Sequence, residues 1–179
     1  MIWYAILSAS SVVVQHGHIA SDATSTQAIL AAIGAVEITQ AQATEIKAAP
    51  YGATLINGVV TPLPAPTPTV AQAAQALLAG GLTITSTSAP AINGTYGCAD
   101  ADQARFSRTF NLIQKAGGSS FPNGLASLVW PLRKAPPVTF SSVSTFLAVE
   151  EAVGNFVLAC DQCELTNGGT LPASSVTIP

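Results

Sequence analysis

A run of alternating prolines in the middle of the chain constrains the fold more than any other feature. Residues 62–69 read Pro-Leu-Pro-Ala-Pro-Thr-Pro-Thr. Each proline lacks a backbone N–H and fixes its own φ, so such a run joins neither a helix nor the interior of a sheet. It forms an extended, semi-rigid spacer instead. We therefore expect separately folded modules on its two sides.

Short predicted strands and helices intermingle on both sides of the proline run, which predicts an α+β fold made of two small modules joined by the spacer and a short helix. No internal repeat at a fixed period is visible. We predict an N-terminal attachment module at residues 1–61, followed by the spacer with its short helix at residues 62–81. A C-terminal module follows at residues 82–165, and a polar tail at residues 166–179.

Capping and turn signals set several of the predicted elements. Thr39 followed by Gln42 is a capping-box pattern that opens a helix ending at Pro50, and Asp100 followed by Gln103 repeats the pattern in the second module. Residues 57–58 are Asn-Gly between β-branched runs, which favours a hairpin with a type I′ turn.

A long helix is predicted from Ser141 or Ser142 to about Cys163. Its apolar positions recur every three and four residues, as expected for a helix that buries one face. These positions are Phe146, Val149, Val153, Phe156, Val157 and Cys160.

The chain has few charged residues, and this composition limits the classes of function that it can have. Charged residues make up 8% of the chain, against about 25% in an ordinary soluble domain. No stretch reaches the ~18 consecutive apolar residues of a membrane span, and a net charge of -3 argues against nucleic-acid binding. Residues 48–99 carry no charged side chain. We expect a subunit whose surface is covered by other chains; the alternative is a monomer with a neutral Ser, Thr and Gln surface.

The short helix after the spacer offers a route to self-assembly. Five apolar residues lie on one of its faces: Val70, Ala73, Ala74, Leu77 and Leu78. A helix of this length is marginal alone and must pack on something. It packs either on copies of itself, with Leu77 and Leu78 as the central oligomer contacts, or on its own module.

The cysteines form the sharpest local chemical signal. Cys160-x-x-Cys163, together with Cys98, falls one ligand short of a cysteine-only zinc site. A redox pair needs its nucleophile at a helix N-terminus, whereas this pair lies near a predicted C-terminus. Buried or free thiols are therefore expected first. A disulfide from Cys98 to Cys160 or Cys163, a metal site and a redox enzyme remain as alternatives.

The remaining polar residues favour surface roles over catalysis. His16 and His18 would share one face of a strand, where they could bind a metal but more commonly stand as surface histidines. Glu150 and Glu151 are adjacent on a helix and diverge by about 100°, which suits a solvated face. Arg105, Arg108 and residues 133–134 form a weak positive patch suited to a partner's carboxylates. No nucleophile elbow, Walker loop or dinucleotide fingerprint occurs, so no cofactor and no enzymatic activity are expected.

The second half of the chain resembles a known domain. The order of Asn93-Gly94-Thr95-Tyr96, the helix from Asp100, Phe121-Pro122-Asn123-Gly124 and the Trp-bearing strand 128–130 carries the likeness. Residues 82–163 resemble the small C-terminal domain of unknown function found in tailed-phage tail-fibre and related virion proteins. The resemblance implies a structural role in a virion tail, brings no catalytic residues, and implies a homotrimer before a dimer.

Three functions follow as expectations. The first is a structural subunit of a phage tail, made in the host cytoplasm because residues 1–7 lack the positive flank of a secretory signal. The second is a receptor- or glycan-binding tip, with Trp130, Tyr96 and Phe121 exposed to carry the ligand. The third is a redox or metal protein that uses the C-x-x-C pair.

Overall fold

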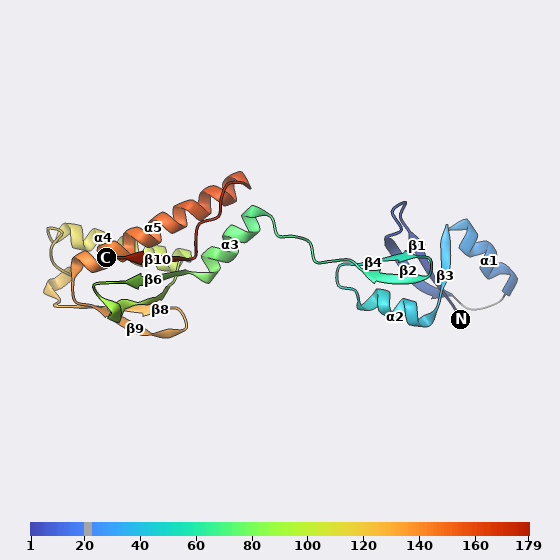
Figure 1. Ribbon diagram of the computed structural model, residues 1–179, viewed down its shortest axis with the longest axis horizontal. Helices are drawn as coiled ribbons and strands as arrows, with labels where there is room; N and C mark the ends of the chain where they lie inside the picture. The colour runs from blue at the N-terminus through green and yellow to red at the C-terminus, as the bar shows by residue number, and fades with distance from the viewer. Residues whose placement is uncertain (20–22) are drawn as a thin grey trace. The chain divides into compact units, whose positions relative to one another are not determined.

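The computed structural model describes residues 1–19 and 23–179. For residues 23–27 it describes the backbone only. Its helices and small, mostly antiparallel sheets confirm the α+β class. The chain forms two compact units, Met1–Thr67 and Pro68–Pro179 (Figure 1), and the boundary between them lies within the proline run.

Unit 1 is a three-stranded antiparallel sheet with two helices and a separate hairpin. Strand β1 lies in the centre, and β2 and β3 pair with its two edges. The elements are β1 (Ile2–Leu7), β2 (Val13–Ile19), α1 (Ala23–Ala32), β3 (Ala35–Ile38), α2 (Gln40–Ala48), β4 (Ala53–Ile56) and β5 (Val59–Pro62). Its core is small and consists of Ala5, Ile38, Ala43, Ile46, Ala53 and Leu55.

The local signals of unit 1 act as predicted. The Thr39 hydroxyl accepts from the Gln42 N–H at 3.1 Å, and the Gln42 amide oxygen accepts from the Thr39 N–H at 2.7 Å, which completes the capping box of α2. Asn57 and Gly58 adopt positive φ values of 51° and 76° between β4 and β5. Two successive left-handed residues are what a type I′ turn requires, so the predicted hairpin is confirmed.

Unit 2 has a three-stranded sheet, a second hairpin and three helices. The sheet order is β10-β6-β7, with β10 parallel and β7 antiparallel to β6. The Arg133 N–H donates to the Thr95 carbonyl and ties the β8–β9 hairpin to this sheet. The elements are α3 (Val70–Gly80), β6 (Leu82–Ser86), β7 (Gly94–Tyr96), α4 (Asp100–Lys115), β8 (Leu128–Leu132), β9 (Ala135–Phe140), α5 (Val143–Thr166) and β10 (Ser175–Ile178), with 3₁₀ turns at Pro90–Ile92 and Pro122–Gly124.

Helix α5 organises the core of unit 2. Its predicted apolar face is confirmed, since all of the predicted positions are buried, and Cys163 extends the stripe. Phe146 lies at the centre of an aromatic cluster that includes Phe106, Trp130 and Phe140, with ring centroids between 5.2 and 5.9 Å from its own. By length and composition α5 could also cross a membrane, alone among helices of the described residues; a buried core helix satisfies the same criteria.

The predicted assignment of α3 to the spacer is wrong. Helix α3 belongs to unit 2, where its apolar face packs on the core together with α5. Ala74 is fully buried, and Leu77 and Leu78 are partly buried against this core. The two leucines are therefore not free to serve as central oligomer contacts. An eleven-residue helix is too short to be stable alone, and the nearest apolar surface is that of its own unit.

The predicted polar tail is also wrong. Residues 175–178 form β10, which pairs in parallel with β6 from Ser175 opposite Thr83 to Ile178 opposite Ser86. Ile178 is 7% exposed and joins the core. The Ser86 hydroxyl, the buried polar group of this region, donates to the Pro179 carbonyl at 2.9 Å. A single short strand with alternating Ser, Val and Thr carries too little apolar signal to be recognised without its partner strand.

The start of α4 differs from the prediction in detail. Ala99, not Asp100, is the N-cap residue, and no side chain caps the helix. The Gln103 amide donates to the Cys98 carbonyl at 2.9 Å instead of closing a capping box. The strand that precedes this helix is short, Gly94–Tyr96, because residues 90–92 form a 3₁₀ turn.

We predict that β10 is part of the cooperative core of unit 2. Replacing Ile178 with Asp puts an unpaired charge into the core and should lower the free energy of unfolding of unit 2 by roughly 2–4 kcal/mol. Urea titration monitored by Trp130 fluorescence, in a Trp3→Phe background, reports on unit 2 alone. Thr177→Asp, at an exposed position of the same strand, is the matched control. Equal urea midpoints for the two variants would show that β10 is dispensable.

Candidate functional site

The three cysteines lie together in the core of unit 2 as free thiols. Cys98 follows β7, and Cys160 and Cys163 lie one turn apart near the end of α5; all three are buried. The Cys98 thiol donates to the Tyr96 carbonyl at 3.8 Å and the Cys163 thiol to the Thr170 carbonyl at 3.5 Å. All three cysteines are free, so the structure contains no disulfide between Cys98 and either partner.

The environment of these thiols disfavours thiolate chemistry. Burial raises the pKa of Cys98 to about 11, and the negative charge of Asp102 acts in the same direction. Burial, followed by the charges of Cys163 and Asp161, also raises the pKa of Cys160. Nucleophilic attack and metal binding both need the thiolate. Among the residues that the structure describes, no group of three or more His, Cys, Asp or Glu is placed to hold a metal ion.

The two histidines share one face of the edge strand β2, as predicted. His16 pairs with Ala5 and His18 with Trp3 across the β1–β2 ladder, and both histidines are exposed. The His18 ring lies 4.9 Å from the Trp3 ring, centroid to centroid. Within the described part of the chain, no further metal-ligating side chain joins them, so the geometry is that of surface histidines at a strand edge.

The aromatic residues proposed for a glycan-binding tip are buried. Trp130 and Phe121 are each 3% exposed and Tyr96 is fully buried. The Tyr96 hydroxyl donates to the Ile92 carbonyl at 2.6 Å, so its polar end is satisfied inside the core. The prediction that these rings are exposed to a ligand is wrong, because they supply much of the apolar area that α5 needs around it.

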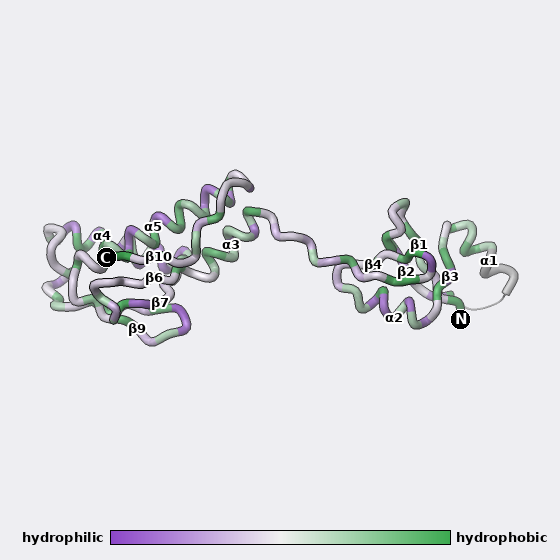
Figure 2. The backbone as a smooth tube through the Cα atoms, in the orientation of Figure 1, coloured by the Kyte–Doolittle hydropathy of each residue, from purple (hydrophilic) through white to green (hydrophobic). Residues whose placement is uncertain are grey.

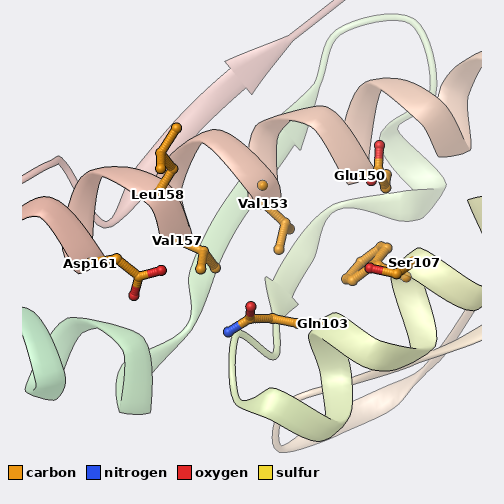
Figure 3. Close-up of a pocket in the computed structure, with 9 residues that line it drawn as sticks. Gln103, Ser107, Glu150, Val153, Val157, Leu158 and Asp161 are labelled. Carbon is orange, nitrogen blue, oxygen red and sulfur yellow. The ribbon is translucent and has the colours of Figure 1, made fainter.

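A groove lies between α4 and α5 in unit 2. Its volume is about 180 Å³. Gln103 and Ser107 approach it from α4, and Val153 and Val157 project into it from α5 (Figure 3). Gly154 also lines it, and a Cβ atom built at Gly154 would meet no atom within 4 Å. The missing side chain therefore leaves open space in the middle of the groove.

Carboxylates border the groove at both ends. Glu150 and Asp161 line it and lie three turns apart on the same side of α5. Desolvation by burial, followed by the charge of Glu151, raises the pKa of Glu150. Of the two carboxylates predicted on a solvated face, Glu151 is exposed and Glu150 is partly buried.

The acidic surface continues beyond the groove into a depression of about 600 Å³ between α3, the start of α4 and the end of α5. Asp100, Asp161 and Glu164 line this depression, and Gln75 donates to Glu164 at 2.8 Å. No Lys or Arg lines the groove or the depression. Sequence analysis missed this surface; the spacing of Glu150, Gly154 and Asp161 by helical turns was the signal that could have indicated it.

Comparison with known proteins finds no matching family model, no similar curated protein and no similar solved structure. The resemblance of residues 82–163 to a domain of phage tail proteins therefore stays a prediction from short motifs.

We predict that all three cysteines titrate as free thiols. In the denatured chain, a thiol reagent should react with three groups whether or not the protein was reduced beforehand. In the folded chain at neutral pH the reaction should be slow, because the raised pKa of Cys98 and Cys160 leaves little thiolate. Recovery of fewer than three thiols without reductant would indicate a disulfide.

We predict that Glu150 lowers the stability of unit 2 at neutral pH. Its pKa is raised in the folded state, which therefore favours the protonated acid more than the unfolded state does. Above that pKa the carboxylate is charged, and its burial lowers the free energy of unfolding. Glu150→Gln should be more stable than wild type at neutral pH, and the gain should vanish below the ordinary pKa of 4.5. Urea titrations over this pH range at low protein concentration measure it. An equal gain from Glu151→Gln would contradict the assignment to burial.

Proposed function

We propose that the chain is a non-enzymatic structural subunit of a bacteriophage tail, acting as a tail fibre, an adaptor or a baseplate-peripheral protein. The observation that carries the proposal is the division of the chain into two units with separate cores, joined through an exposed proline-rich segment. Such a chain can hold one partner at each end, because proline-rich segments resist collapse and act as spacers.

The surface chemistry is consistent with a protein that works in contact with other chains. Figure 2 shows that hydrophilic segments are short and scattered, with one at the turn between β8 and β9. Unit 1 leaves several large apolar side chains exposed, including Ile56 at 55% and Val59 at 62% on its hairpin. Exposed apolar side chains next to few charges are typical of surfaces that partners cover.

The likeness of residues 82–163 to a domain of tail-fibre and related virion proteins supports the same role. On this proposal the chain is made in the host cytoplasm and resides in the virion tail. Its partners are other tail proteins, copies of itself, as a trimer first and a dimer second, and a host surface that the tail contacts. It has no nucleic-acid, membrane or cofactor requirement. No observation favours the glycan-binding or C-x-x-C alternatives, since their residues are buried.

The proposal is tested on particles of the phage that encodes the chain. We expect mass spectrometry of purified particles to detect the chain at a fixed ratio to other tail proteins. A nonsense mutation in its gene should yield particles that lack the chain and are defective in tail assembly or adsorption. Full infectivity without the chain, together with its absence from wild-type particles, would contradict a structural role.

A further inference from the structure

The groove between α4 and α5 has a definite chemical pattern along its length. Glu150 and Asp161 border its ends, and Val153 and Val157 supply apolar side chains between them (Figure 3). Gly154 also lines the groove and leaves open space there. Within the described residues neither carboxylate makes an ion pair, because the recorded pair joins Arg105 to Asp102 at 3.2 Å. The groove therefore suits a segment that presents cations on either side of an apolar side chain.

Helix α4 of the same protein carries such a segment on its exposed surface. Arg108, Leu112 and Lys115 are spaced four and three residues apart, so they share one helix face. All three are exposed, Leu112 at 44%, and among described residues neither cation makes an ion pair. We call Arg108, Leu112 and Lys115 the basic stripe.

The basic stripe cannot reach the groove of its own chain. Gln103, Phe106 and Ser107 line the groove from α4, and at 100° per residue Leu112 lies about 120–180° from them around the helix. The groove and the basic stripe thus face in opposite directions from α4. Any contact between them must join two molecules.

We propose that the basic stripe of one copy docks into the α4–α5 groove of a second copy. Leu112 enters the space left by Gly154, and Arg108 and Lys115 face Glu150 and Asp161. The cations lie about 10.5 Å apart along their helix and the carboxylates about 16.5 Å apart along theirs. The long, flexible Arg and Lys side chains cover the difference.

This contact also provides the charge that the groove lacks. The carboxylate of Glu150 is partly buried next to Glu151, and a cation placed opposite it offsets both the lost hydration and the repulsion. The same pairing places Leu112, an exposed leucine on a charged helix, against the apolar side chains of Val153 and Val157.

The two surfaces are different, so the contact is head-to-tail. Head-to-tail contacts close into rings or continue as open chains. Because the surfaces face opposite directions from α4, two copies cannot satisfy both contacts at once, which favours three or more copies over a dimer. The inference rests on the proposed structural role, for which a self-repeating contact is useful, but its test is independent of particles.

Charge reversal in the full-length chain tests the pairing. We expect wild type to sediment at low ionic strength as a species several times its 18.1 kDa chain mass, and to dissociate as salt screens the pairs. Arg108→Glu with Lys115→Glu, or Glu150→Lys with Asp161→Lys, should weaken association about tenfold or more. The chain with all four changes should regain association, because the complementarity is restored with the signs exchanged.

A second pair of variants tests the groove by size. Gly154→Phe fills the open space, and Gly154→Ala adds only a methyl group where no atom lies within 4 Å. We expect the Phe variant to stay monomeric and the Ala variant to associate like wild type. Circular dichroism and Trp130 fluorescence establish that both are folded.

A wild-type chain that stays at 18.1 kDa at all concentrations would overturn the inference. So would an assembly that is unchanged by charge reversal, or one that the fourfold exchange fails to restore. If the chain is found in particles but is monomeric alone, the proposed structural role stands and the self-docking inference fails.

Discussion

Burial of the apolar face of α5 is the interaction on which unit 2 depends. Strands β6 and β10, helices α3 and α4 and the β8–β9 hairpin all pack around it, and Phe146 contacts one ring from α4 and two from the hairpin. Each large side chain buried in this way stabilises the fold by about 1.5–3 kcal/mol. Cys160 and Cys163 belong to the same stripe and Cys98 is buried in the same core, where they pack as small apolar residues.

The groove between α4 and α5 results from the way these two helices pack. Helices α4 and α5 meet through Phe106 and Phe146, whose ring centroids lie 5.9 Å apart. Beside this contact Gly154 leaves a gap, and within the described residues the carboxylates that border the gap make no ion pair. A core that needs only one face of each helix leaves the other faces free for intermolecular contacts.

The sequence predicted those properties of the candidate residues that depend on neighbours in the same helix or strand. The position of Cys160 and Cys163 near the C-terminal end of a helix followed from the apolar periodicity, and the placement of His16 and His18 on one face followed from strand periodicity. The burial of Trp130, Tyr96 and Phe121 did not follow, because an aromatic residue near a turn is compatible with either a core or a binding surface until its neighbours are known.

The sequence alone determined the elements that depend on backbone rules and short-range periodicity. These include the division at the prolines, the Thr39 capping box, the Asn57-Gly58 turn and the buried stripe of α5. Tertiary structure alone decided where α3 packs and that residues 175–178 form a strand. The physical reason is that a short helix and an edge strand are too weakly stabilised by local interactions, so their state depends on partners distant in the chain.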